Sequence, residues 1–449
     1  MKKFYVLLCL AVTFYACRQT DYTKVIHNPN LFSYTVHELN RVVMGNNFSP
    51  IVASRNYLYA SIAAYEIMAA GHPNEYNSLA GQVNGLETVP VPPANKKVDF
   101  PFAALLAYCK LGEAVTFPEG SMKEYVDSLK KLARDNDMPS DVYNNSIAYA
   151  DNVSKAILDW SKNDNYAQTR SAPKYSITDE EGRWIPTPPM YASAMEPHWN
   201  EIRPLVMDSI HQFPAPKALT FDMKDSTSAY CQEVMKIKTA VENLTDEQKH
   251  IADFWDDNPF KLNVSGHVMF GTKKFSPPGH WQSITGIAAQ KANADFAATV
   301  YAYAKMNIAM FDAFIQCWNE KYTYNTARPE TVINKYLDPN WTPYLQTPPF
   351  PEYTCGHSTC SSAAAEALTS VFGDNFAYTD TSELEFGIKS RSYTSFRHAA
   401  EENNWARFYG GIHFHNSCII STEMGKKVGD LVVTKLKMKK EPLTAKLEK

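Results

Sequence analysis

The stretch from residue 283 to residue 320 constrains the fold more than any other part of the sequence. It is rich in alanine, and large apolar residues recur along it at helical spacing: Phe296, Val300, Tyr303, Ile308 and Phe311. Apolar residues that recur every three or four positions line one side of an α-helix. The stretch therefore predicts one very long helix, with Lys321 just beyond its end.

Further helical patterns lie on both sides of this stretch. They cover residues 34–46, 50–70, 100–115, 121–136, 139–163, 222–242, 245–255, 358–372 and 395–409, and a last helix begins at His413 and runs to about residue 436. Thr245 and Gln248 have the spacing of a capping box. No alternating strand pattern competes with these helices, and residues 256–281 predict a loop. The predicted fold class is all-α, with two packed helical bundles.

The length of 449 residues allows two packed units. We predict an N-terminal helical bundle over residues 18–163, an ordered crossover segment over 164–220 and a C-terminal helical bundle over 221–449. The crossover holds Trp184 and Trp199 among many prolines. A solvated linker would rarely carry two tryptophans, so this segment should pack on the bundles.

Residues 1–17 predict an export signal. Lys2 and Lys3 precede an apolar run that is too short to span a bilayer. The run ends at Ala16-Cys17, which is similar to a bacterial lipobox, and Cys17 would then carry a lipid. We expect an exported bacterial lipoprotein of the cell envelope, in the periplasm or the outer membrane, that meets the membrane only through this anchor. The alternative is an ordinary exported protein cleaved nearby.

Charge and cysteine usage exclude two classes of site. The chain has 44 basic and 48 acidic residues, which does not favour nucleic acid as a partner. The cysteines beyond Cys17 show no C-x-x-C spacing, which argues against a zinc site.

Three short pieces between residues 321 and 413 carry the candidate chemistry. They run from Lys321 to Pro329, from Tyr353 to His357 and from Ala406 to His413. Their cations are Lys321, Arg328 and Arg407, which can donate hydrogen bonds to the oxygens of an anion.

The second piece adds a backbone contact. Gly356 lets the main chain approach a ligand, and the helix that begins near His357 points its amides at a bound anion. Two other Gly-His pairs, Gly266-His267 and Gly279-His280, could pass for this loop. Both precede Lys321 in the sequence, so we prefer Gly356-His357.

The order and spacing of the three pieces resemble a known signature. The chain contains Lys321 and Arg328-Pro329 separated by six residues, then Gly356-His357, and then Arg407 and His413 separated by five residues. This order is similar to the signature of the type 2 phosphatidic acid phosphatase and vanadium-dependent haloperoxidase superfamily. Residues 254–257, 277–281 and 410–414 are also similar to exported bacterial haloperoxidases, so the resemblance covers most of the chain. It implies two bundles of the haloperoxidase and acid phosphatase type, with residues 221–449 as the catalytic bundle.

The resemblance also implies roles for the site residues. Lys321, Arg328, Arg407, Cys355 and the Gly356 amide would hold the oxygens of vanadate or phosphate. His413 would ligate vanadium or attack phosphorus, and His357 would be the general acid–base. Asp256 or Asp257 would brace Arg407.

The sequence departs from the family pattern at three positions. Cys355 stands where serine is usual before Gly-His, Ala406 where serine is usual before the second arginine, and Ser417 where aspartate is usual after the last histidine. A thiol is a weak hydrogen-bond donor, and it oxidises beside a source of hypohalous acid.

Three functions stay open at the level of sequence. The first is a haloperoxidase with vanadate as cofactor, and peroxide and halide as its substrates. The second is an acid phosphatase that hydrolyses phosphate monoesters through a phosphohistidine. The third is a degenerate member of the superfamily that only binds phosphate.

Overall fold

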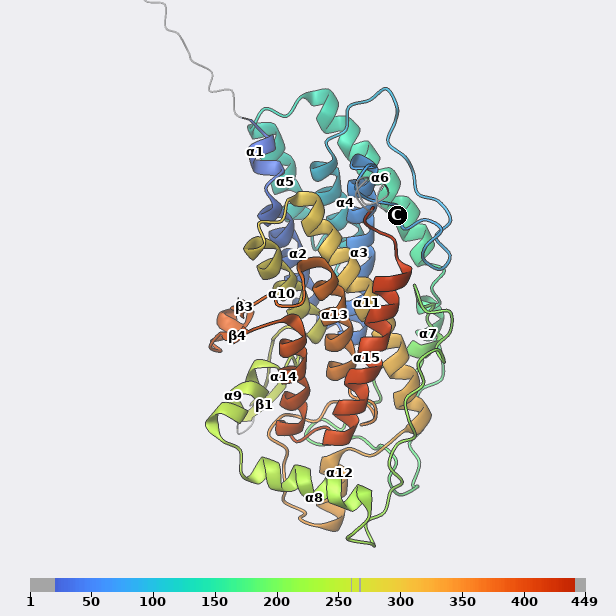
Figure 1. Ribbon diagram of the computed structural model, residues 1–449, viewed down its shortest axis with the longest axis vertical. Helices are drawn as coiled ribbons and strands as arrows, with labels where there is room; N and C mark the ends of the chain where they lie inside the picture. Colours follow the sequence, from blue (N-terminus) through green and yellow to red (C-terminus); the bar gives the residue numbers. More distant parts are fainter. Residues whose placement is uncertain (1–20, 260, 266–267, 441–449) are drawn as a thin grey trace, which may run out of the picture.

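The computed structural model describes residues 21–259, 261–265 and 268–440, and helices dominate it (Figure 1). The strands of this described part form two small antiparallel sheets. The predicted all-α class is confirmed. The predicted leader with Cys17, and the pair Gly266-His267, lie outside the described residues.

The first half of the chain is helical up to Thr169. Its elements are α1 (Thr23–Ile26), α2 (Pro29–Gly45), α3 (Pro50–Gly71), α4 (Phe100–Ala114), α5 (Lys123–Asp135), α6 (Ser140–Ser161), α7 (Tyr166–Thr169) and the 3₁₀ helix η1 (Trp199–Glu201). Trp184 and Trp199 of the crossover are fully buried. Within this segment, Met195 N donates a hydrogen bond to Pro349 O (2.9 Å). The crossover is thus tied to a loop of the second half.

The second half contains the longest helix. Its elements are α8 (Ala229–Glu242), α9 (Asp246–Phe254), β1 (Lys261–Ser265), β2 (Val268–Thr272), α10 (Pro277–Lys291), α11 (Phe296–Tyr324), α12 (Pro329–Tyr336), α13 (Gly356–Phe372), β3 (Tyr378–Asp380), η2 (Ser382–Phe386), β4 (Arg391–Tyr393), α14 (Phe396–Tyr409) and α15 (His415–Lys435). The capping box predicted at Thr245 and Gln248 is present at the start of α9.

The predicted single helix over 283–320 is wrong, because the chain breaks between α10 and α11. Asn293 adopts a left-handed backbone (φ 51°), and the Asp295 side chain caps α11 by accepting from Ala298 N (2.8 Å). The predicted loop over 256–281 is also wrong, because it contains β1, β2 and the start of α10. Two prolines at the first positions of α10 favour a helix start.

Several predicted helix ends also differ from the structure. α2 begins at Pro29 rather than at residue 34, and α8 begins at Ala229 rather than at residue 222. Lys321 lies in the last turn of α11 rather than beyond it. His413 precedes α15, which begins at His415.

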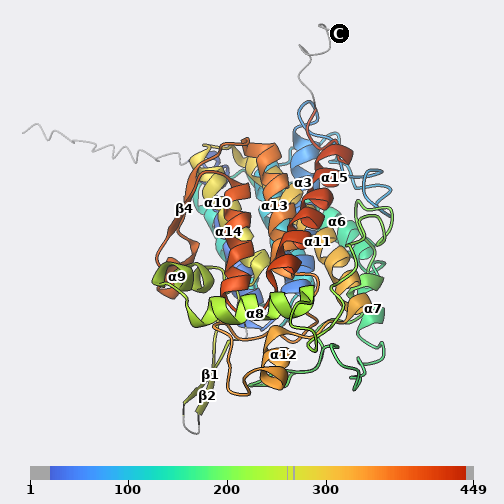
Figure 2. The same ribbon diagram turned by 60° about the horizontal axis from the view of Figure 1, so that its bottom comes forward.

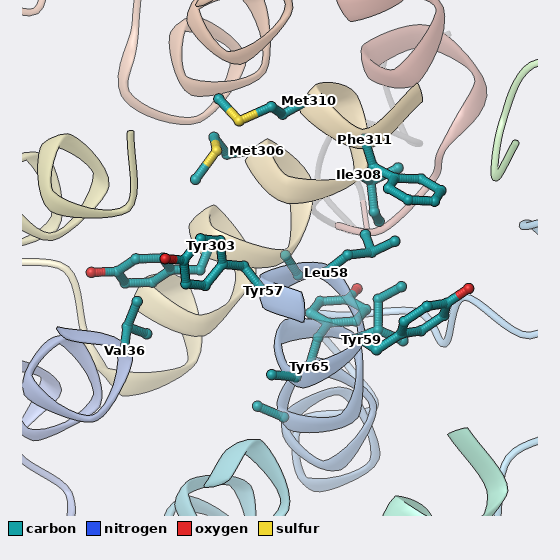
Figure 3. Packing of buried hydrophobic residues seen from close by; sticks show 14 of the residues in the cluster. Val36, Tyr57, Leu58, Tyr59, Tyr65, Tyr303, Met306, Ile308, Met310 and Phe311 are labelled. Carbon is teal, nitrogen blue, oxygen red and sulfur yellow. The ribbon is translucent and has the colours of Figure 1, made fainter. Parts of the chain in front are cut away.

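One apolar core includes residues from Ile26 to Met438, so both predicted bundles contribute to it. Helices α3 and α11 pack side by side, and Figure 3 shows Tyr57 of α3 beside Tyr303 of α11 and Leu58 of α3 below Phe311 of α11. No helix of the described part is long and apolar enough to cross a bilayer.

Four helix ends meet at one end of the bundle. There α11 and α14 finish and α13 and α15 begin, and α8 and α12 lie across this end (Figure 2). The connections between these helices carry the three sequence pieces, so the fold gathers them in one place.

Candidate active site

Lys321 is fully buried in the last turn of α11. Its Nζ donates to the carbonyl oxygens of Pro351 (2.8 Å) and Glu352 (3.1 Å), and it lies 4.9 Å from the ring centre of Phe350. An ammonium group has three donors. The two carbonyls therefore leave one N–H for a ligand.

Arg328 joins the first sequence piece to the third. It is the N-cap residue of α12 and is fully buried. Its Nε donates to Phe350 O (2.7 Å), and its Nη1 donates to Ile412 O (2.7 Å) and lies 3.1 Å from Nε2 of His413. The structure thus brings a cation of the first piece directly against the predicted vanadium ligand.

Arg407 lies near the end of α14 and is 3% exposed. Its Nη1 donates to the backbone carbonyls of Trp255 (2.7 Å) and Asp256 (3.2 Å). The predicted bracing by an aspartate carboxylate is therefore replaced by backbone contacts. The Asp256 carboxylate instead lies 3.6 Å from Lys261 Nζ.

Glu352 is the residue that sequence reasoning missed. Its Oε1 accepts from Nδ1 of His413 (2.9 Å) and from Phe414 N (3.2 Å), and both Glu352 and His413 are 2% exposed. A carboxylate on Nδ1 keeps the proton there and leaves Nε2 with a lone pair. The only sequence signal was an acidic residue three positions before Cys355, which is not specific.

Gly356 is the first residue of α13, so its amide has no acceptor within the helix. A Cβ at this position would lie 3.3 Å from the Trp318 ring and 4.0 Å from Cε of Lys321. Glycine therefore keeps open the space between this amide and the Lys321 side chain.

His357 follows on α13, and its side chain is 14% exposed. Its Nε2 lies 3.9 Å from Oδ2 of Asp257. Asp257 was predicted as a brace for Arg407, but its carboxylate faces His357. The carboxylate is placed to stabilise a protonated His357.

Burial and mutual repulsion shift the pKa values of the cationic groups downward. Burial lowers the pKa of Lys321 to about 8 and that of Arg328 to about 10, and each also feels the positive charge of a neighbour. Burial, then the charge of Arg407, holds the pKa of His357 well below its usual value. A bound anion would relieve all three shifts.

Several buried polar atoms of the site have no hydrogen-bond partner among the described residues. They are Arg328 Nη2, Arg407 Nε, His357 Nε2 and Asp257 Oδ2. Unpaired buried N–H groups are costly and uncommon, and a cluster of them indicates a place for a bound ligand or water. Two guanidinium donors, one ammonium hydrogen and one helix-start amide form a donor set that fits a tetrahedral oxyanion.

An apolar cavity of about 220 Å³ leads to the site. Arg407, His357 and Asp257 line it on the polar side. Its remaining walls come mainly from the crossover and from the segment before α13, and include Pro188, Met190, Met195, Pro348, Pro349 and Phe350. The cavity is suited to small, weakly solvated molecules.

The three residues that depart from the family pattern are all buried. Cys355 is fully buried, and its amide donates to Ser421 Oγ (2.7 Å). Burial raises the pKa of the Cys355 thiol, but hydrogen bonding to Cys418 and the nearby His413 outweigh burial and hold it below its usual value. Ala406 is buried, and Ser417 Oγ has no partner within the described part of the chain.

Comparison with known proteins gives consistent results. A family model described as the VCPO second helical-bundle domain matches residues 301–441. A solved structure described as the first bacterial vanadium-dependent iodoperoxidase is 42% identical to this chain. The match covers 92% of this chain and 98% of that one, with a TM-score of 0.87.

Two structures of bacterial vanadium-dependent chloroperoxidase, in apo and holo forms, are similar in fold alone. Their identities are 18% and 17%, and their TM-scores 0.65 and 0.63. The matches cover 86% and 87% of this chain, and 94% and 93% of the two chloroperoxidase chains. A search of curated proteins finds no match.

Proposed function

This chain belongs to the vanadium-dependent haloperoxidase family, and from that membership we propose that it is a vanadate enzyme that oxidises iodide with hydrogen peroxide. Membership itself makes the chain an enzyme with the helical-bundle fold of the family. Iodide is proposed because the relative that is 42% identical is described as an iodoperoxidase.

The observation that carries the proposal is the His413–Glu352 pair within the set of buried cations. Glu352 holds the proton at Nδ1 of His413 (2.9 Å), so Nε2 is the atom that would ligate vanadium. Arg328 Nη1 lies 3.1 Å from that atom. Lys321, Arg328, Arg407 and the amide of Gly356 would hold the oxygens.

Bound vanadate would supply the activation of hydrogen peroxide toward a halide. The residues of the chain do the rest. The three cations neutralise the negative charge of the oxyanion, and the Lys321 N–H that the two carbonyls leave free can polarise an oxygen. His357 would hold or move a proton at its edge of the cavity, with the Asp257 carboxylate 3.9 Å away to stabilise the protonated ring.

Cys355 also favours iodide over the other halides. A thiol donates weakly and a thiolate does not donate at all, so in either state Cys355 would hold an oxygen of the anion less strongly than the hydroxyl of the family pattern. A weaker set of donors gives a weaker oxidant, and iodide is the halide that is oxidised most easily.

The test is to purify the protein, remove bound anions and add orthovanadate. Peroxide-dependent oxidation of iodide and bromide is measured beside hydrolysis of a phosphate monoester. We expect vanadate-dependent iodide oxidation, less bromide oxidation and no hydrolysis. Hydrolysis that vanadate inhibits would instead support the phosphatase function.

Two histidine variants locate the activity. His413→Ala should abolish it, because no other ligand atom replaces Nε2. His415→Ala is the matched control, since Nδ1 of His415 lies 2.8 Å from Nζ of Lys236 and its ring lies 4.6 Å from that of Trp405 rather than in the site. Full activity in His413→Ala would refute the assignment.

A further inference from the structure

A second histidine lies buried behind the site. His280, on α10, has its Nδ1 2.9 Å from Oδ1 of Asp257 and its Nε2 2.9 Å from Oδ2 of Asp380. All three side chains are almost fully buried. Because each ring nitrogen faces a carboxylate oxygen at hydrogen-bond distance, the ring is an imidazolium that donates to both.

The position of this ring is fixed from several sides. The ring of His280 stacks on Trp255, with centroids 4.6 Å apart and an interplanar angle of 27°. Asp380, at the end of β3, also accepts from the amide (2.9 Å) and hydroxyl (2.6 Å) of Ser382. Asp380 cannot turn away without losing these bonds, so it holds the far side of the imidazolium in place.

The charges of this cluster favour the protonated form of His280. Burial lowers the pKa of His280, but the carboxylates of Asp257 and Asp380 outweigh burial and hold it well above its usual value. Glu383 of η2 has its Oε1 3.8 Å from Nδ1 of His280. Burial raises the pKa of Glu383 to about 8, so Glu383 keeps its proton at neutral pH.

We propose that His280 is a positioning residue for the acid–base histidine. It holds Oδ1 of Asp257 so that the second oxygen, Oδ2, faces Nε2 of His357. The proposal rests on the proposed function, because it assigns His357 a proton during the reaction.

The geometry between Asp257 and His357 supports this role. Oδ2 and Nε2 are 3.9 Å apart, and neither has another hydrogen-bond partner in the described part of the chain. Such contacts are often long in a ligand-free site and shorten in the reacting complex. A movement of about 1 Å would make this contact a hydrogen bond.

The other charged groups around His357 make this carboxylate necessary. Arg407 of α14, His413 and Lys321 of α11 disfavour the protonated ring, and Cys355 favours it as a thiolate. Asp257 is the carboxylate that lies within ion-pair distance of Nε2. Its negative charge, held by His280, allows His357 to take up a proton.

A cation is the alternative occupant of this cluster. Ligand atoms of Asp257, His280 and Glu383 lie within 4.8 Å of one another. A metal ion on Nδ1 would replace the proton shared with Asp257. The 2.9 Å contact between Nδ1 and Oδ1 is a normal hydrogen-bond length and favours the proton.

The first test compares two variants of α10. His280→Gln removes the charge, and Gln282→Leu is the matched control, because it loses the buried contacts of Gln282 with Asn307 without touching Asp257. We expect His280→Gln to lower kcat by about ten-fold or more, with little change in affinity for inorganic phosphate. Gln282→Leu should lower Tm but keep kcat. The proposal would be overturned if, in both variants, kcat fell in proportion to the loss of Tm.

The second test does not need turnover, so it separates this proposal from the proposed function. Nitrogen-15 NMR of histidine-labelled protein with bound inorganic phosphate should show protons on both nitrogens of His280. It should also show a hydrogen-bonded proton on Nε2 of His357 that is lost in His280→Gln. A single N–H on His280, an unchanged His357 signal in the variant, or one divalent cation per chain by elemental analysis would each overturn the proposal.

Discussion

Replacing Glu352 by glutamine tests how the proposed vanadium ligand, His413, is oriented. The change keeps the size of the side chain and removes its charge. Oε1 of Glu352 is the acceptor for Nδ1–H of His413 (2.9 Å) and for Phe414 N (3.2 Å), and the pair is buried. An amide oxygen accepts these bonds less strongly, and the amide can also turn its NH₂ toward Nδ1.

The expected magnitude follows from the role of such partners. Loss of the group that orients a ligating histidine costs about 10- to 100-fold in metal affinity. This corresponds to about 1.4–2.7 kcal/mol. We expect Glu352→Gln to weaken orthovanadate binding by this factor, measured by calorimetric titration of the anion-free protein. Phosphate should lose less, because the cations hold it and no bond to vanadium is involved.

The control for this prediction is Glu330→Gln. Glu330 is also buried in this half of the chain, but it accepts from Thr347 rather than from His413. This role of Glu352 is refuted if Glu352→Gln binds vanadate as the wild type does. It is also refuted if Glu330→Gln loses as much affinity.

Three further predictions concern the anion-binding groups. Cys355→Ser should raise vanadate-dependent halide oxidation, because a hydroxyl donates hydrogen bonds better than a thiol. It should also slow inactivation by peroxide, because a hydroxyl does not oxidise as a thiol does. Equal inactivation rates in the variant and the wild type would contradict this. Lys321 is charged below its pKa of about 8 and neutral above it. The affinity for phosphate, measured by calorimetry, should therefore fall more steeply above about pH 8 in the wild type than in Lys321→Met. An equal fall of affinity with pH in the two proteins would contradict this. Gly356→Ala should weaken phosphate binding by about ten-fold, because the added Cβ would lie 3.3 Å from the Trp318 ring and crowd it. An unchanged affinity for phosphate would show that the anion lies elsewhere.

The sequence predicted most helices because apolar spacing and caps act locally. The capping box at Thr245 is one example, and the start of α3 at Pro50 is another. The break between α10 and α11 was missed because the alanine-rich pattern continues across it. The signals at Asn293 and Asp295 were present in the sequence, but periodicity outweighed them.

The site was predictable where chemistry depends on residue type and order. Lys321, Arg328, Gly356, Arg407 and His413 lie together in the structure, as a shared anion site requires. Their individual roles stay predictions.

The orienting carboxylates were not predictable in the same way. Glu352 lies 61 positions from His413 and Asp257 lies 23 positions from His280, so only the folded chain pairs them. Many acidic residues could have filled either place. Periodicity and motif spacing do not distinguish a carboxylate that orients a histidine from one on the surface.

The most direct test of the central claim is a crystal structure of the protein soaked in orthovanadate. We expect vanadium bonded to Nε2 of His413, with its oxygens on Lys321, Arg328, Arg407 and the amide of Gly356. Vanadate bound at another place, or a His413 ring that contacts no vanadium in a loaded crystal, would contradict it.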